Sequence, residues 1–115
     1  MRLEVIKMKI SELIDALELE VLNPGDTSRD INGCYCSDLL SHCMSNISEN
    51  NIWITVQVNI NIVAIAVLTE LSAIVISQDM AIDASVLDKA KSENVTILRS
   101  PLPSYELCLK IGNCI

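Results

Sequence analysis

Apolar residues recur along the chain with two periods, one typical of helices and one typical of strands. In ISELIDAL, residues 10–17, the side chains of Ile10, Leu13, Ile14 and Leu17 follow helical spacing and form one apolar face. The same period predicts three further helices, over residues 37–47, 83–94 and 101–112. Turn and cap residues support these bounds, with Ser37 and Asp83 as N-caps, Pro103 in a first turn and Gly112 as a stop.

Short runs of β-branched and aliphatic residues predict strands between these helices. The runs cover residues 19–22, 51–56, 72–77 and 95–98. Residues 57–71 fit two structures. The alternation in VQVNINIVAIAV continues the preceding strand. In the other interpretation Asn61 caps a helix that has one apolar face, made of Val63, Val67, Leu68 and Leu71. Propensity favours the strand and the distance to the next strand favours the helix, so the pattern leaves both open.

The alternation of helices with short apolar strands predicts right-handed crossovers and a parallel sheet. We therefore expect a three-layer α/β/α sandwich with a mostly parallel sheet of four to five strands. This single domain covers residues 8–115, and residues 1–7 form an N-terminal extension or a short strand. Ligands of such sheets bind beyond the carboxyl ends of the strands, where the strand order reverses. The loops that this rule selects are 23–37, 56–61, 77–83 and 99–103.

Charge and composition exclude several classes of protein. The 115 residues carry a net charge of -7 without a Lys/Arg cluster, which argues against binding to nucleic acids or anionic membranes. The most apolar stretch, residues 62–76, contains Thr69, Glu70 and Ser72 and is shorter than a membrane span. Charged residues near the N-terminus interrupt any signal-peptide pattern. Five cysteines, an odd number, favour free thiols in a reducing cytoplasm.

The segment SRDINGCYCSDLLSHC, residues 28–43, gathers most of the reactive residue types of the chain. Cys34, Cys36, His42 and Cys43 lie close together, but Cys-x-Cys spacing matches structural zinc sites poorly. On the predicted helix Cys43 faces inward and His42 faces solvent. Cys34 and Cys36 precede a helix N-terminus, which lowers the pKa of thiols. A catalytic thiol also needs a base, and His42 lies more than one turn into the helix.

The same segment also offers a cradle for an anion. Arg29, Asn32 and Gly33 precede a helix N-terminus, where backbone N–H groups bind phosphate. However, neither glycine-rich phosphate-binding motif is present, and Asp38 in the first helical turn would repel an anion. Alternatively, Arg29 pairs with Asp30 or Asp38 and braces a turn at Asn32-Gly33.

Taken together, several runs of the chain resemble the DRTGG-domain family, over residues 8–111. The family pattern D-R-x-[VI]-T-G-G-Y corresponds here to SRDINGCY, residues 28–35, and is followed by SDLLS at 37–41. The runs NIWITVQ (51–57), NIVAIAVLTELSAIVI (61–76) and PLPSYEL (101–107) continue the resemblance. It implies a fold similar to the N-terminal domain of HPr kinase/phosphorylase, with a helix over residues 60–70. It also implies a regulatory or dimerisation module without catalysis.

The chain departs from that pattern at three positions. Ser28, Asn32 and Cys34 replace the aspartate, the threonine and the second glycine, whereas Arg29, Gly33, Tyr35, Ser37 and Asp38 match. Since cysteine adopts positive φ less readily than glycine, Cys34 is expected to change what the loop binds.

The leading hypothesis is a small cytoplasmic regulatory module, a homodimer without a cofactor or catalytic activity. It binds a small molecule or a protein partner through the strand-to-helix loop 28–38 and the end of the strand over 53–56. The dimer forms through an exposed apolar helix face or a strand edge. The alternatives are a small thiol-dependent enzyme and a metal-binding module that use Cys34 and Cys36. The expected ligand-binding residues are Arg29, Asn32, Gly33, Tyr35, Ser37, Asp38, Thr55 and Gln57.

Overall fold

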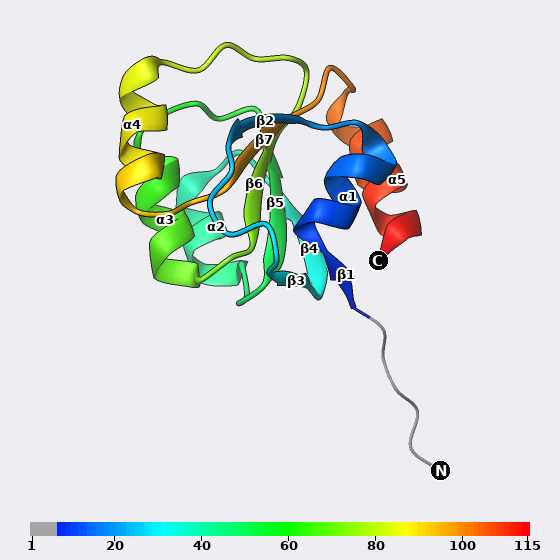
Figure 1. Ribbon diagram of the computed structural model, residues 1–115. Helices are drawn as coiled ribbons and strands as arrows, with labels where there is room; N and C mark the ends of the chain where they lie inside the picture. Colours follow the sequence, from blue (N-terminus) through cyan, green and yellow to red (C-terminus); the bar gives the residue numbers. More distant parts are fainter. Residues whose placement is uncertain (1–6) are drawn as a thin grey trace.

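A computed structural model describes residues 7–115 of the chain (Figure 1). Residues 1–6 of the expected N-terminal extension lie outside the described residues, and the first strand, β1, covers Met8–Lys9. The described part is an α/β fold with five helices, as the alternating pattern predicts. The helices are α1 (Ile10–Leu17), α2 (Leu40–Asn46), α3 (Asn61–Thr69), α4 (Ala84–Ser92) and α5 (Ser104–Cys114).

The main sheet has five strands in the order β2-β7-β6-β5-β4. Four of them are parallel and β2, at one edge, is antiparallel to β7. A separate two-stranded sheet pairs β1 with β3 (Asp30–Ile31), next to the ion pair of Lys9 with Asp30. The strands of the main sheet are β2 (Glu20–Asn23), β4 (Gly33–Cys36), β5 (Asn51–Thr55), β6 (Ala73–Ile76) and β7 (Ile97–Arg99).

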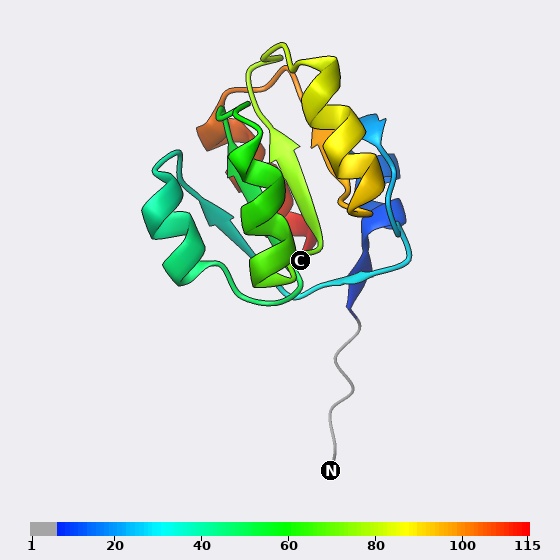
Figure 2. The ribbon, with the colours of Figure 1, turned by 90° about the vertical axis from the view of Figure 1, so that its left-hand side faces the viewer.

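The parallel strands lie side by side in the order in which the chain makes them, from β4 to β7. Because successive right-handed crossovers in one direction fall on the same side of a sheet, α2, α3 and α4 cover one face. Figures 1 and 2 show these three helices together, with α1 and α5 on the opposite face. The strand order does not reverse among the parallel strands, so the expected crevice at a reversal point is absent from the described fold.

The sheet separates two apolar layers, as the three-layer prediction requires. Trp53, Ile74 and Ile97 belong to the layer under α2, α3 and α4, and Ile52 and Ile54 belong to the layer under α1 and α5. All four residues of the central strand β6 are buried, which explains why its sequence is continuously apolar. Among residues 7–115, no helix is long and apolar enough to cross a membrane.

The helix expected over residues 60–70 is confirmed as α3. Three other expectations are wrong. The helix expected from Ser37 begins only at Leu40, and Ser37 Oγ instead accepts the N–H of Leu39 at 3.2 Å. The residues before it form the edge strand β4 rather than a loop. Gly112 does not end α5, which continues to Cys114 because Ile111 buries its side chain in the core and its carbonyl binds the N–H of Ile115.

Candidate functional site

The residues predicted to bind a ligand fall at opposite ends of β4 and β5. Arg29, Asn32 and Gly33 lie at the amino ends of these strands, and we call them the amino-edge group. The carboxyl-edge group lies at the other ends and consists of Ser37, Asp38, Thr55 and Gln57. The expectation that Thr55 and Gln57 share an edge with Asp38 is confirmed, whereas the single loop 28–38 that was to unite all of them is not formed.

Arg29 binds the end of α3 and the turn before β5. Its Nη1 donates to the main-chain oxygen of Leu71 at 2.6 Å, and its Nη2 donates to the main-chain oxygen of Glu70 at 2.7 Å. Nη2 also donates to Oδ1 of Asn50 at 2.9 Å. The expected pairing of Arg29 with Asp30 or Asp38 is therefore wrong. The guanidinium neutralises carbonyls at a helix C-terminus, where a cation is stabilising.

Asn32 and Gly33 pack against the start of β5. Asn51 donates from Nδ2 to Oδ1 of Asn32 at 3.0 Å, and the Asn32 amide donates to the carbonyl of Glu49 at 3.0 Å. A Cβ atom on Gly33 would lie 3.0 Å from Nδ2 of Asn51, so this contact favours glycine. Neither residue has positive φ, and neither does Cys34, so the expected turn and the expected strain at Cys34 are both absent.

A hollow of about 370 Å³ lies beside the amino-edge group. Its lining residues include Arg29 and the residues Glu70 and Glu93, which follow the C-terminal ends of α3 and α4. Since helix C-termini carry partial negative charge and Arg29 is engaged with carbonyls, this hollow is unfavourable for an anion. The phosphate cradle that the sequence suggested around Arg29 is thus not supported by its surroundings.

The carboxyl-edge group is a connected set of hydrogen bonds. Oδ1 of Asp38 accepts from the Thr55 hydroxyl at 2.7 Å and from the N–H of Val56 at 2.8 Å. The Thr55 oxygen in turn accepts the N–H of Gln57 at 3.0 Å, and Nε2 of Gln57 donates to the carbonyl of Asp38 at 3.2 Å. Thr55 is buried, whereas Asp38 is exposed. The second carboxylate oxygen of Asp38 and the side-chain oxygen of Gln57 take part in none of these four bonds.

Ser37 joins the carboxyl-edge group to α2 and to the core. Its carbonyl accepts the indole N–H of Trp53 at 2.9 Å and lies 3.5 Å from the Cys43 sulfur, which donates to it. Trp53 and Cys43 are both fully buried. Asp38 therefore directly follows the residue whose carbonyl holds α2 on the sheet, and a movement of Asp38 would be felt at that contact.

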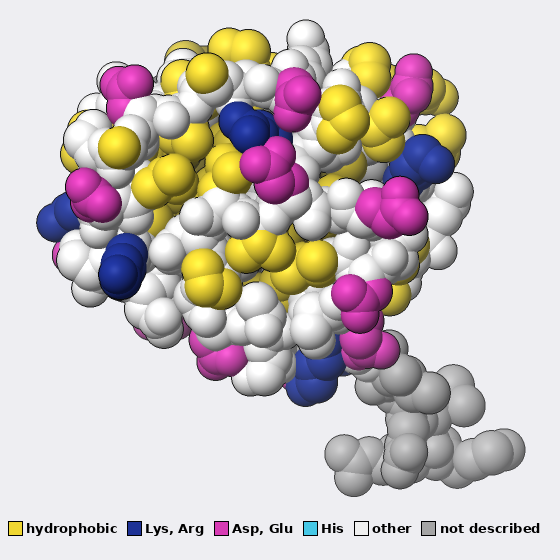
Figure 3. All heavy atoms as spheres, turned by 45° about the horizontal axis from the view of Figure 1, so that its top comes forward, with side chains coloured by type: hydrophobic (Ala, Val, Ile, Leu, Met, Phe, Trp, Pro, Cys, Tyr) yellow, Lys and Arg dark blue, Asp and Glu magenta, His cyan; other side chains and the backbone are white. Residues whose placement is uncertain are grey.

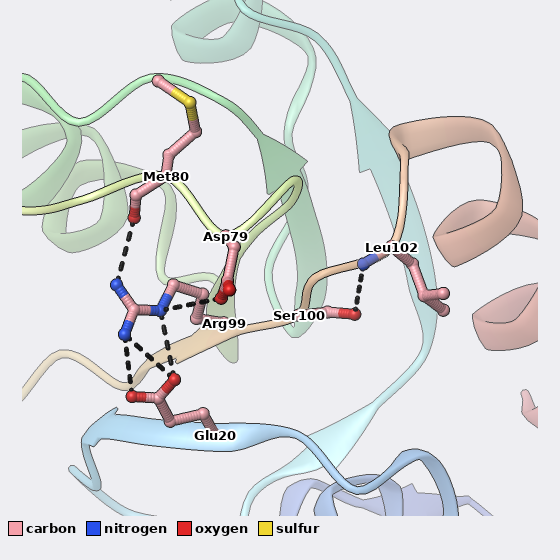
Figure 4. Close-up of polar contacts among 6 residues, drawn as sticks. All are labelled: Glu20, Asp79, Met80, Arg99, Ser100 and Leu102. Atoms are coloured by element: carbon pink, nitrogen blue, oxygen red, sulfur yellow. Dashed lines mark hydrogen bonds and ion pairs between the residues drawn. The ribbon is translucent and has the colours of Figure 1, made fainter.

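Figure 4 shows the residues at the carboxyl end of β7. Most of them lie in the loops 77–83 and 99–103, which the sequence selected without naming a binding residue in them. Arg99 contacts both carboxylate oxygens of Glu20, with Nη2 2.8 Å from Oε2, and Nη1 donates to the carbonyl of Met80 at 3.2 Å. Its Nε also lies 3.5 Å from Asp79. Asp79 and Gln78 both have positive φ. The polar run Ser-Gln-Asp directly after a buried apolar strand is the sequence signal that could have identified these residues.

The carboxyl edge of the sheet carries more acidic than free basic groups. Asp38, Asp79 and Glu20 lie at strand ends there. The guanidinium of Arg99 already binds the carboxylate of Glu20 and the carbonyl of Met80. Figure 3 shows the top of the molecule brought forward, with acidic side chains scattered among apolar ones. This edge therefore favours neutral or cationic groups.

The cysteine and metal hypotheses find little support in the geometry. Burial raises the pKa of Cys34 to about 12, and burial together with the Cys108 thiol raises the pKa of Cys36. The expected lowering is wrong because both residues lie in β4 rather than before a helix N-terminus. His42 is exposed and Cys43 is buried, as predicted. Within residues 7–115, no cluster of three or more His, Cys, Asp or Glu residues is arranged to hold a metal ion.

Tyr35 occupies the middle of β4, between the two edge groups. Its ring is partly buried against the core layer under α2, α3 and α4, and its register partner is Trp53. This position matches the packing role that an amphipathic aromatic residue often has, and it places Tyr35 away from the acceptors at the carboxyl edge.

Comparisons with known proteins agree with this fold. No curated protein sequence matches the chain. A crystal structure of the CBS and DRTGG domains of the regulatory region of Clostridium perfringens pyrophosphatase, complexed with the activator diadenosine tetraphosphate, has the same fold, with a TM-score of 0.74 and 19% identity. The match covers 90% of this chain and 45% of that one, so the chain spans less than half of its length. The family model of the DRTGG domain matches residues 12–114, and the chain belongs to the DRTGG domain family.

Proposed function

We propose that the chain is a non-catalytic regulatory module that binds a small molecule at its carboxyl-edge group. The observation that carries this proposal is the family match over residues 12–114, together with a similar fold in the regulatory region of a pyrophosphatase. That region is complexed with an activator, so this fold occurs in a regulatory region to which a small-molecule activator is bound.

The ligand of this chain presents neutral or cationic groups to the site. Asp38 offers a carboxylate oxygen and Gln57 an amide oxygen, while the acidic side chains of Glu20 and Asp79 lie at the same sheet edge. A free polyphosphate would be repelled by these charges. The uncharged nucleoside part of a nucleotide, an amine, or a basic segment of a partner protein would fit the acceptors.

Binding at this group alters the position of α2. A ligand that donates hydrogen bonds to Asp38 or Gln57 competes with the bonds that Val56 and Thr55 donate to Asp38, and Ser37 passes the change to α2. The ligand shifts the equilibrium between two positions of α2 only by the difference between its binding free energies for those two positions. The helix is therefore the element that a regulated partner senses.

The module is a homodimer that pairs through the outer faces of α2 and α3. α3 has no charged residue, and a helix that is apolar on all sides is normally covered on all sides. The outward apolar side chains of this face are Leu39, Met44, Ile60, Val67 and Leu68. The five free cysteines support a reducing compartment such as the cytoplasm as the place where the module works.

A thermal-shift screen tests the ligand proposal. The full chain is melted with adenosine, with diadenosine tetraphosphate in the presence and absence of Mg²⁺, with spermidine and with succinate. Asp38→Asn removes the charge but keeps an acceptor for Thr55 and Val56, and Asp88→Asn on the exposed side of α4 is the matched control. A ligand at a hundred times its Kd stabilises the folded state by about 2.7 kcal/mol.

The proposal predicts a saturating rise in melting temperature with adenosine or spermidine. The rise is reduced in Asp38→Asn and retained in Asp88→Asn. No rise with any of these compounds would favour a role in assembly alone, and a rise that survives Asp38→Asn would place the ligand elsewhere. Any turnover of these compounds by the chain would contradict the non-catalytic assignment.

A further inference from the structure

Three thiols meet between the edge strand β4 and the last helix. Cys34 and Cys36 are two residues apart in a strand, so their side chains project to the same face. In the register of the sheet they lie beside Ile52 and Ile54, which belong to the layer under α1 and α5. Both thiols therefore point to the side of the sheet that α5 covers.

Cys108 is the α5 residue that faces these thiols. α5 packs on β4 and β5 (Figure 1), and the half-buried Cys108 contacts the same apolar layer as Ile52 and Ile54. The Cys108 thiol acts on Cys36 both as a hydrogen-bonding and as an electrostatic neighbour, whereas its effect on Cys34 is electrostatic alone. Cys36 therefore interacts with Cys108 in more ways than Cys34 does, and its side chain remains open to solvent.

We infer that Cys36 and Cys108 form a reversible disulfide that fastens the edge strand β4 to α5. A low-molecular-weight disulfide such as oxidised glutathione supplies the oxidising equivalents. The thiolate of one cysteine attacks this disulfide, forms a mixed disulfide and releases one glutathione thiolate. The second cysteine then attacks the protein sulfur of the mixed disulfide and releases the second glutathione. Two protein thiols are oxidised, two glutathione thiols are formed and two protons leave the cysteines.

The bond would act next to the carboxyl-edge group. Cys36 directly precedes Ser37, whose carbonyl holds Trp53 and Cys43, and Asp38 follows. Fastening β4 to α5 restricts the movement of this segment, so oxidation would make the module less responsive at that edge. Formation of the bond is measured directly and does not depend on the proposed function.

The test treats the reduced full chain with oxidised glutathione at mildly alkaline pH and identifies the bond by mass spectrometry. Trypsin cleaves after Lys110 and so places Cys108 and Cys114 on different peptides. A cross-linked peptide therefore shows directly which of these two cysteines of α5 has formed the bond. Cys34, Cys36 and Cys43 remain on one tryptic peptide, and the variants Cys36→Ser and Cys34→Ser distinguish them. Cys108→Ser is the second variant, and circular dichroism of each reduced variant checks the fold.

The expected product is two mass units lighter than the reduced chain, carries no glutathione and joins the peptide of Cys36 to that of Cys108. It forms in Cys34→Ser but not in Cys36→Ser or Cys108→Ser. Because the bond closes a long loop, it raises the melting temperature by about 10 °C, and dithiothreitol reverses the rise. A bond from Cys108 to Cys34 or Cys43, only glutathione adducts, or only bonds between chains would overturn the inference.

Discussion

Arg29 donates a 2.6 Å hydrogen bond from Nη1 to the main-chain oxygen of Leu71, a residue 42 positions further along the chain. The same guanidinium holds the carbonyl of Glu70 and the side chain of Asn50. The arginine of the family motif is thus engaged in fixing the end of α3 against the segment before β3. This contact assigns Arg29 to the stability of the fold, and the ligand proposal places the binding groups at the other end of the strands.

Replacing Arg29 tests that assignment. Arg29→Ala removes three hydrogen bonds and leaves the carbonyls of Glu70 and Leu71 without this donor, so we expect a loss of about 2–4 kcal/mol in the free energy of unfolding. Arg29→Lys should lose about half as much, because an ammonium cannot fork between these acceptors. Urea denaturation measures both. The exposed Lys91→Ala should stay within about 0.5 kcal/mol, and an equally small loss for Arg29→Ala would contradict the assignment.

Two glycines should respond in opposite directions to alanine. Gly25 has φ +52°, and a Cβ there would lie 2.5 Å from Oγ1 and 2.9 Å from the backbone nitrogen of Thr96. We expect Gly25→Ala to destabilise the fold by about 2–4 kcal/mol. A Cβ at Gly112 would meet nothing within 4 Å, and Gly112→Ala should stabilise α5 by about 1 kcal/mol. Melting temperatures that move the same way in both variants would contradict this account.

The amphipathic elements could be predicted from the sequence because each buries one side. The residues 10–17 form a helix with the bounds that the apolar spacing indicates, and Ile10 and Leu13 are fully buried. α3 could not be distinguished from a strand by its pattern, since apolar residues occur on all its sides and no period stands out. The resemblance to a family, rather than the periodicity, decided that segment.

The candidate site was harder to predict because its contacts join distant segments. The partners of Arg29 are carbonyls at Glu70 and Leu71, which no local pattern reveals. β4 was missed because an edge strand with exposed cysteines lacks the apolar run of a buried strand. The cysteines suggested chemistry, yet their surroundings raise rather than lower their pKa. The grouping of Asp38 with Thr55 and Gln57 could be predicted, since strand ends of a parallel sheet share an edge.

The exposed face of α3 provides a test of the homodimer. Leu68 is 65% exposed on α3, and Leu109 is 52% exposed on α5, at the opposite face of the sheet. Leu68→Glu should convert the dimer to a monomer, because it places a charge in a desolvated interface. Leu109→Glu is the matched control and should leave the dimer intact. Size-exclusion chromatography with light scattering reads the mass, and a wild-type monomer at high concentration would refute the dimer.

The cysteines of β4 should react slowly and with a steep dependence on pH. Burial raises the pKa of Cys34 to about 12, and the protonated thiol, which predominates below that pH, is a poor nucleophile. The rate of alkylation by iodoacetamide should therefore rise about tenfold per pH unit and continue to rise above the ordinary thiol pKa of about 8.5. Cys36, near Cys108, Asp38 and Cys43, should behave alike. A rate that levels off near neutral pH would revive the thiol-enzyme hypothesis.

Amide NMR of the ¹⁵N-labelled chain tests the central claim, that the carboxyl-edge group binds the ligand, most directly. The sole tryptophan donates its indole N–H to Ser37, so its side-chain resonance reports on this edge together with the amides of Asp38, Val56 and Gln57. In titrations with adenosine and with spermidine, the account predicts saturating shifts of these four resonances. It also predicts an unmoved Arg29 amide, far from this group. Shifts confined to the surroundings of Arg29, or no shift with either compound, would contradict it.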